Sequence, residues 1–179
     1  MDLHDNEEDV VDAGELKTHL TVLLQNKVEA VIAEHAAERA GQPLFLYYAM
    51  QNIHTGADEG FVAPQEYLDM CTLSSAGQSA ASEPDDLRAY CALNIMLDEA
   101  IGRTRCAIAA AGMDNNTIFI VANDNGGQRE VPGSNAPLSG AKGGLNNGGI
   151  LTQVLHLSLS LSLCLPLSSS FSSSLSASN

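Results

Sequence analysis

Two short, continuously apolar runs stand on either side of a long helical pattern in this sequence. The first is "PLFLYYAM" at residues 43–50, and the second is "TIFIVA" at residues 117–122. Short apolar runs bounded by turn residues are typical of strands that are buried on both faces, as in a parallel sheet. A strand, a long helix and a second strand form a βαβ unit. The sequence therefore predicts an α/β fold, with a mostly parallel sheet flanked by helices.

Three helices are expected around these runs. From about residue 18 to 40, apolar side chains recur at three- and four-residue spacing and form one face: Leu20, Leu23, Leu24, Val28, Val31 and Ile32. Residues 63–71 are compatible with the beginning of a short helix. The longest helix is expected to start near Ser82, a capping residue followed by Pro84 and acidic side chains, and to stop at Gly112.

The two ends of the chain differ in composition from its middle. Residues 1–15 are strongly acidic and are expected to form an exposed segment. No Asp, Glu, Lys or Arg follows Lys142, and leucine alternates with serine from residue 155 before serine dominates. We therefore predict one domain over residues 1–150. Residues 151–179 are predicted to be a low-complexity tail that is disordered or is not native coding sequence.

Charge and cysteine spacing exclude several classes of protein. The chain has 22 acidic and 8 basic residues, which argues against binding to a nucleic-acid backbone. The N-terminus lacks the basic start and apolar core of a signal peptide, and no apolar run is long enough to predict a membrane span. The four cysteines form no CxxC pair and no zinc-finger spacing, so we expect buried or free thiols and not a disulfide framework.

Polar side chains follow both predicted strands. His54 lies four residues beyond the first run, and Asp124 and Asn125 come directly after the second. Functional groups gather at the carboxyl ends of strands in open α/β sheets, and carboxylate and amide oxygens are natural ligands for calcium or magnesium. A glycine-rich loop then carries Lys142. Each feature alone has a more ordinary interpretation, namely a turn, a surface histidine or a solvated lysine.

The order of these motifs resembles the sulfatases, and within them the branch of arylsulfatase B (N-acetylgalactosamine-4-sulfatase). The segment "PLFLYYAMQNIH" resembles the strand that leads to the family's active-site histidine. "YCALNIMLDEAIGRTRCAIAAAGMDNNTIFIVANDNGGQ" is similar to the family's helix and metal-binding strand end, and "GSNAPLSGAKGGLNNGGI" to its lysine-bearing loop. The resemblance covers about residues 1–150 and implies an alkaline-phosphatase-like fold.

The resemblance also implies roles for individual residues. Asp124 and Asn125 would be ligands of one calcium ion, His54 would help protonate the leaving group, and Lys142 would hold a sulfate oxygen. The substrate would be a sulfate ester, with a glycosaminoglycan sugar as the candidate, and the enzyme would be lysosomal or secreted. Asn115 begins the sequon Asn-Asn-Thr and is a candidate for glycosylation.

The sequence departs from the family at the nucleophile. Family enzymes use a formylglycine made from the cysteine of a Cys-x-Pro-Ser-Arg motif, and none of the four cysteines here lies in that pattern. We therefore expect this chain alone to be inactive. We also expect it to be poorly stable, because strands such as residues 44–50 would expose backbone edges and apolar surface. Two alternatives stay open: a non-catalytic truncated remnant with at most weak calcium binding, and a metal-dependent phosphoesterase of the alkaline-phosphatase-like group. The second usually has more metal-binding aspartates and histidines than this sequence offers.

Overall fold

The structure, a computed structural model, describes residues 4–9, 18–55, 60–71, 84–128, 132–151 and 154–157. In chain order the elements are β1 (His4–Asp5), β2 (Glu8–Asp9), α1 (Leu20–Glu38), α2 (Gln65–Met70), α3 (Pro84–Ala110), the 3-10 turn η1 (Asp114–Asn116), β3 (Phe119–Ala122), α4 (Asn147–Ile150) and β4 (Val154–Leu157). The three predicted helices are confirmed as α1, α2 and α3. None of the helices in these ranges is long and apolar enough to cross a bilayer.

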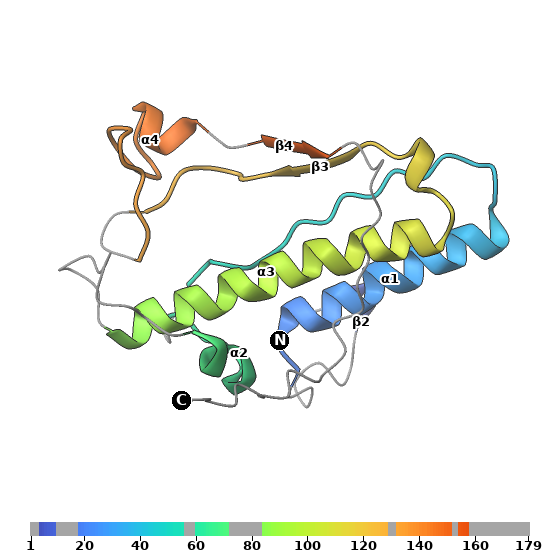
Figure 1. Cartoon of the computed structure of the whole chain (residues 1–179), viewed down its shortest axis with the longest axis horizontal. Helices are drawn as coiled ribbons and strands as arrows, with labels where there is room; N and C mark the ends of the chain where they lie inside the picture. The colour runs from blue at the N-terminus through green and yellow to red at the C-terminus, as the bar shows by residue number, and fades with distance from the viewer. Residues whose placement is uncertain are drawn as a thin grey trace, which may run out of the picture.

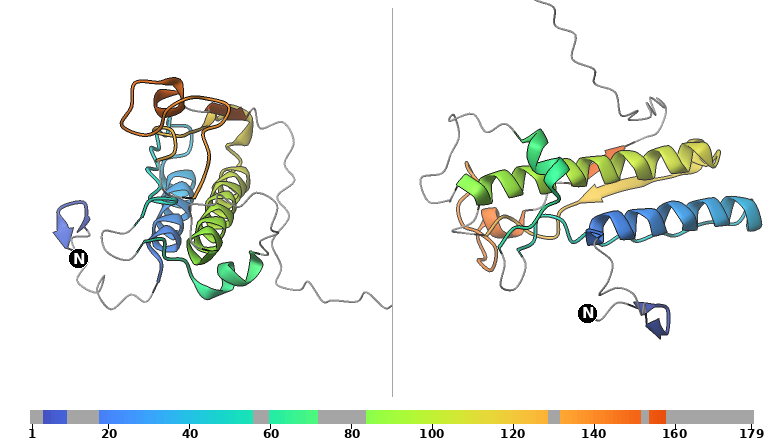
Figure 2. Two further views of the ribbon diagram at one scale, coloured as in Figure 1. Left: turned by 90° about the vertical axis from the view of Figure 1, so that its left-hand side faces the viewer. Right: turned by 90° about the horizontal axis from the view of Figure 1, so that it is seen from below.

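Helices α1 and α3 lie side by side and form the centre of the molecule (Figures 1 and 2). Residues 43–55 lead back from the end of α1 along this helix pair, and β3 later runs in the same direction (Figure 1). This is the chain path of the predicted strand–helix–strand unit. α3 ends at Ala110, just before Gly112, the predicted stop, which has a φ of +68°; the Met113 amide then donates to the Ile108 carbonyl oxygen at 3.1 Å.

The buried face of α1 differs from the apolar face that was predicted. Val28 and Ile32 are buried as expected, but Leu20 is 37% exposed. The full set of buried positions is Thr21, Gln25, Val28, Ile32 and His35. Polar side chains thus share the buried face with apolar ones, because each has a hydrogen-bonding partner: Asn52 for Thr21, Thr104 on α3 for Gln25, and the Gln42 carbonyl oxygen for His35.

A polar cluster joins α1 to α3. The Gln25 side chain is 1% exposed, and its Nε2 donates to Thr104 Oγ1 at 3.2 Å. Arg103 Nε donates to Glu29 Oε1 at 2.7 Å. Burial alone would raise the pKa of the Glu29 carboxyl, but hydrogen bonds from Arg103 and Gln25 outweigh it and the pKa is lowered. Buried polar groups that satisfy one another in this way fix how two helices align.

Residues 43–50 are not the doubly buried strand that was predicted. Leu44 and Tyr48 pack on a core cluster of Val28, Ile32 and Ile108, so one face of the segment is covered by the helices. The intervening Phe45 and Tyr47 are 90% and 81% exposed. The segment is extended but forms no strand pairing within the described ranges. The prediction was wrong because an apolar sequence shows only that both faces of a segment could be buried. Among the described residues, the helices bury one face and nothing packs on the other.

Strand β3 confirms the second predicted strand, but the predicted burial on both faces was wrong, since Ile120 is 60% exposed, and the partner of β3 is antiparallel. It pairs with β4, which places Phe119 opposite Leu157 and Ala122 opposite Val154. β1 and β2 form a separate antiparallel hairpin. The predicted mostly parallel sheet is therefore not seen among the described residues. Residues 43–50, the predicted parallel neighbour of β3, stay unpaired there. β4 lies beyond residue 150, where the sequence predicted the domain to end, and that domain boundary remains a prediction. Residues 158–179 of the predicted tail lie outside the described residues.

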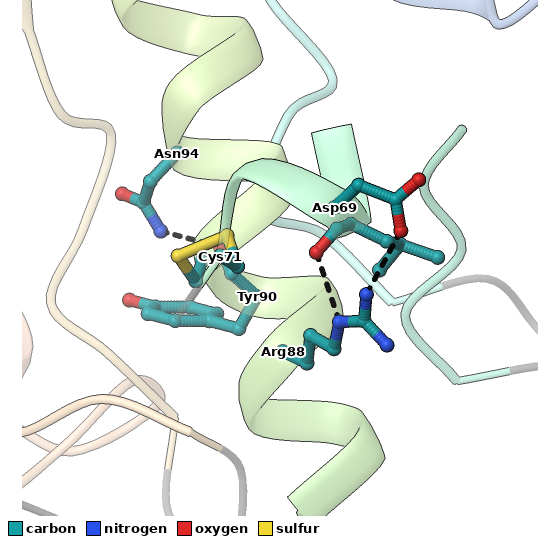
Figure 3. Close-up of a disulfide and its surroundings, with 7 residues drawn as sticks. Asp69, Cys71, Arg88, Tyr90 and Asn94 are labelled. Atoms are coloured by element: carbon teal, nitrogen blue, oxygen red, sulfur yellow. Dashed lines mark hydrogen bonds and ion pairs between the residues drawn. A yellow bond between two sulfur atoms is a disulfide. The ribbon is translucent and has the colours of Figure 1, made fainter. Parts of the chain in front are cut away.

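Helix α2 is fastened to α3 by a disulfide between Cys71 and Cys91 (Figure 3). Their Cα atoms are 6.1 Å apart. Beside it, Arg88 Nε donates to the Leu68 carbonyl oxygen at 2.8 Å, and the Arg88 guanidinium pairs with Asp69 at 3.1 Å. The expectation of thiols was wrong for these two cysteines. The chain folds α2 back onto α3, a proximity that cysteine spacing does not reveal.

We predict that the attachment of α2 weakens at high pH through Tyr67. Its hydroxyl donates to Glu99 Oε2 at 2.8 Å, and burial together with this carboxylate raises its pKa to about 12. Because the folded pKa lies above the ordinary value of 10, the stabilising contribution is complete below pH 10 and is lost as the pH rises towards 12. Urea unfolding of wild type and of Tyr67→Phe between pH 10 and about 12 measures this contribution to the free energy of unfolding. The stability difference between them should shrink as the pH rises, and a constant difference would contradict the prediction.

Candidate functional site

His54 lies in a tight turn that follows the extended segment. The His54 amide donates to the Gln51 carbonyl oxygen at 3.3 Å, which closes a four-residue turn. Ile53, the third residue of this turn, has a φ of +71°. Type II turns need a positive φ at that position and normally place glycine or asparagine there, so a β-branched residue is strained. Strain of this kind is common at functional sites.

Asn52 anchors the turn to both long helices. Its Oδ1 accepts a hydrogen bond from Thr21 Oγ1 on α1 at 2.6 Å, and its Nδ2 donates to the Leu93 carbonyl oxygen on α3 at 3.2 Å. Asn52 was not among the predicted site residues. The sequence shows only that Asn52 lies two residues before the candidate histidine. It does not show that Thr21 and Leu93 would be the hydrogen-bond partners of Asn52.

Asp124 and Asn125 follow the end of β3, as the sequence predicted. The Asp124 side chain is exposed and that of Asn125 is half-buried. A carboxylate and an amide oxygen are suitable donors for a hard cation, but calcium takes six to eight oxygens. No group of three or more His, Cys, Asp or Glu side chains in the described ranges could hold a metal ion. The donor pair therefore has the right chemistry and is incomplete within these ranges.

The loop that carries Lys142 is tied to the end of β3 by backbone hydrogen bonds. The Lys142 amide donates to the Gly127 carbonyl oxygen at 3.0 Å, and the Gly126 amide donates to Gly149 O at 3.0 Å. The Gly148 amide closes the loop on Ser139 O at 2.7 Å. The main chain beyond Asp124 and Asn125 is thus joined directly to the segment that carries the lysine.

Asn135 reinforces the same junction with its side chain. It exchanges two hydrogen bonds with the Gly127 peptide, since Gly127 N donates to Oδ1 at 2.8 Å and Nδ2 donates to Gly127 O at 2.8 Å. Nδ2 also approaches the Gly140 carbonyl oxygen at 3.3 Å. Sequence reasoning missed this residue as well, because an asparagine in a glycine-rich loop is an ordinary turn residue.

The structure brings His54 and Lys142 into contact. Lys142 Nζ lies 3.4 Å from His54 Nε2, although 88 residues separate them in sequence. The other ring nitrogen, Nδ1, lies 2.9 Å from the Thr55 carbonyl oxygen. Both side chains are exposed. In Figure 1 the loop with α4 and the end of residues 43–55 lie at the same end of the helix pair. An anion bound there could contact a cationic side chain and a proton-exchanging side chain together.

Asn115 lies away from this contact, in the 3-10 turn η1 between α3 and β3. Its side chain is exposed. Thr117, the third residue of the sequon, donates its hydroxyl to the Met113 carbonyl oxygen at 2.7 Å. An exposed asparagine in a turn suits glycosylation, which stays a prediction.

Comparison with known proteins decides the family. The model of the family "Sulfatase" matches residues 2–156. This chain belongs to the sulfatase family. Among curated sulfatases, mouse (Mus musculus) arylsulfatase J is 33% identical over 130 residues, which are 73% of this chain and 19% of the relative. The chain therefore spans about a fifth of that sulfatase.

Solved structures agree on the fold. The crystal structure of Ps i-CgsB and that of its complex with k-i-k-neocarrahexaose each match with a TM-score of 0.71. Each match covers 87% of this chain and 31% of the other chain, at 22% identity. At this identity the likeness concerns the fold, which supports the predicted alkaline-phosphatase-like sulfatase architecture. The resemblance to the sulfatases is thus confirmed at the level of the family.

Proposed function

We propose that this chain provides part of the active site of a calcium-dependent sulfuric ester hydrolase of the arylsulfatase B type. The observation that carries the proposal is the contact between Lys142 and His54 beside the end of β3. Family membership supports the same class of reaction. The activity, the branch and the roles of the four residues are our proposal, since the chain spans only part of its relatives.

The side chains suit separate tasks at a sulfate ester. The Lys142 ammonium would hold a sulfate oxygen and stabilise the charge that develops as the S–O bond breaks. The His54 imidazole would help protonate the leaving group at the ester oxygen, a task that histidine side chains commonly perform in enzymes. The hydrogen bonds of Gly127 keep the lysine loop next to the end of β3, and the contact between Lys142 and His54 would let both side chains reach one anion.

Asp124 and Asn125 would be the ligands of calcium from this chain. When bound, the ion would polarise sulfate oxygens. The two donors follow one strand and are the kinds of oxygen that calcium prefers. Further ligands would have to come from outside the described residues.

The four cysteines of this chain do not fit the formylglycine nucleophile of the family. Formylglycine is made from the cysteine of a Cys-x-Pro-Ser-Arg motif, which is missing around all four cysteines. Cys71 and Cys91 are in addition engaged in a disulfide. We therefore expect the purified chain to bind sulfate without hydrolysing its esters. The same observation favours the second candidate, a non-catalytic remnant.

A sulfated carbohydrate is the substrate class that we propose, with a glycosaminoglycan sugar as the candidate. Ps i-CgsB, which shares the fold, was solved with the oligosaccharide k-i-k-neocarrahexaose. We also propose a lysosomal or secreted location. Its support is the Cys71–Cys91 disulfide, because disulfides persist in oxidising compartments, together with the exposed sequon at Asn115.

Titration of the chain with inorganic sulfate tests the binding part of this proposal. We expect the NMR signals of the Lys142 ammonium and the His54 ring to shift together as sulfate is added. Lys142→Met should abolish the shift at His54, because the anion loses its cationic partner. Lys27→Met, at an exposed position on α1, is the matched control and should leave the shift unchanged.

Two outcomes would count against the proposal. Equal sulfate responses in Lys142→Met and Lys27→Met would show that general charge attracts the anion. A clear preference for phosphate over sulfate at the same signals would favour the phosphoesterase alternative.

A further inference from the structure

The Asn52 side chain holds the strained turn before His54 and bridges the helix pair. Asn52 accepts from Thr21 Oγ1 at 2.6 Å and donates to Leu93 O at 3.2 Å. Thr21 is buried on α1, and Leu93 is buried on α3. Both partners therefore lie on buried faces of the helix pair, whereas His54 itself is exposed.

The backbone of the turn needs such an anchor. Ile53 has a φ of +71°, a conformation that β-branched residues avoid. Residues in sparsely populated conformations persist where surrounding contacts hold them in place. Asn52 precedes Ile53 directly. The two hydrogen bonds of the Asn52 side chain therefore hold the backbone on the N-terminal side of the strained residue in place.

The contacts of the His54 ring assign its tautomer. A carbonyl oxygen can only accept, so the nitrogen facing Thr55 O at 2.9 Å, Nδ1, carries the hydrogen. A lysine ammonium can only donate, so the nitrogen facing Lys142 Nζ at 3.4 Å, Nε2, presents its lone pair. His54 is therefore neutral in this arrangement, with its hydrogen on Nδ1.

We propose that Asn52 is a positioning residue for His54. By holding the strained turn it places the ring between Thr55 O and Lys142, and so fixes the Nδ1–H tautomer with the Nε2 lone pair directed at the lysine. The significance for catalysis rests on the proposed function, since Nε2 is then the ring nitrogen that faces the site, and it would have to take up a proton before it could pass one to the leaving group. The positioning itself is a property of this chain and can be tested without turnover.

The test is a nitrogen NMR spectrum of the full chain labelled with ¹⁵N-histidine, recorded at about pH 8, where an ordinary histidine is neutral. Protonated and unprotonated ring nitrogens resonate in separate regions, and His54→Gln identifies the His54 signals. In wild type we expect a protonated Nδ1 and an unprotonated Nε2. In Asn52→Ala we expect loss of this pattern, with averaged signals or a protonated Nε2, and faster hydrogen exchange of the peptide covering residues 51–55.

A matched control separates positioning from general loosening of the helix pair. Thr104→Val removes the buried hydrogen bond between Gln25 and Thr104, which joins the same two helices away from the turn. This variant should keep the wild-type His54 pattern. If Asn52→Ala loses its helical circular dichroism, Thr21→Val takes its place, since it removes only the hydroxyl that donates to Asn52 and should shift His54 in the same direction.

The proposal is overturned if wild-type His54 carries its hydrogen on Nε2. It is also overturned if a folded Asn52→Ala chain, or a folded Thr21→Val chain in its place, gives the wild-type pattern, or if Thr104→Val disturbs that pattern as strongly. Failure of the sulfate titration with an intact Asn52 effect would reject the proposed function and leave the positioning in place.

Discussion

Replacing both Cys71 and Cys91 with alanine is expected to lower the free energy of unfolding by about 3 kcal/mol. The disulfide joins residues 20 apart in sequence, and a cross-link over a loop of that length removes conformational entropy from the unfolded chain. It also secures α2, whose other contacts to α3 are partly exposed, such as the Arg88–Asp69 pair. Urea unfolding followed by circular dichroism measures the change.

Reduction of the wild-type chain provides an independent check on the same quantity. The reduced wild type should unfold at the urea concentration of the double variant, and reductant should have no effect on that variant. Cys106→Ala is the control, because Cys106 is not in a disulfide in the structure. A double variant as stable as the oxidised wild type would show that the cross-link contributes nothing.

Gly126→Ala is expected to cost about 1–3 kcal/mol and to dismantle the candidate site locally. A Cβ at Gly126 would collide with the backbone carbonyl of Gly148, and a backbone group cannot yield as a flexible side chain can. The hydrogen bond from Gly126 N to Gly149 O should break, and the loop that brings Lys142 to His54 should move. Hydrogen exchange of the Lys142 amide and the His54 NMR signals report that movement.

Gly102→Ala is the matched control for this substitution. Gly102 lies inside α3, and a Cβ there would meet no atom within 4 Å apart from its chain neighbours and the surrounding backbone of its own helix. Alanine in a helix interior should stabilise the chain by about 0.5–1 kcal/mol. The two glycine variants are thus predicted to differ in sign. If the Lys142 amide of Gly126→Ala exchanged hydrogen at the wild-type rate, the close approach of Gly126 to the Gly148 backbone would be contradicted.

The helices could be predicted from the sequence because their signals are local. A capping region before Pro84 and a glycine at 112 bracket α3, and the structure has the helix between them. Strand pairing depends on distant partners, and here the local signal was insufficient. Residues 43–50 have the composition of a buried strand, yet Phe45 and Tyr47 are exposed and β3 pairs with β4.

The candidate site shows the same division. His54, Asp124, Asn125 and Lys142 were identifiable from residue type, order and the sulfatase resemblance, and the structure brings His54 and Lys142 together. The side chains that hold them were not identifiable. Asn52 and Asn135 act through backbone groups and a distant helix, which no spacing pattern records. The Cys71–Cys91 disulfide was missed for the same reason.

The most direct test of the central claim is aryl sulfate turnover by a chimera. Residues 2–156 of this chain would replace the matching segment of a sulfatase whose motif cysteine is converted to formylglycine, with the conversion verified by mass spectrometry. We predict that the chimera hydrolyses the ester, and that Lys142→Ala lowers kcat by about 10²–10³. A folded, formylglycine-bearing chimera that hydrolyses the ester no faster than its Lys142→Ala variant would contradict the assignment of this site.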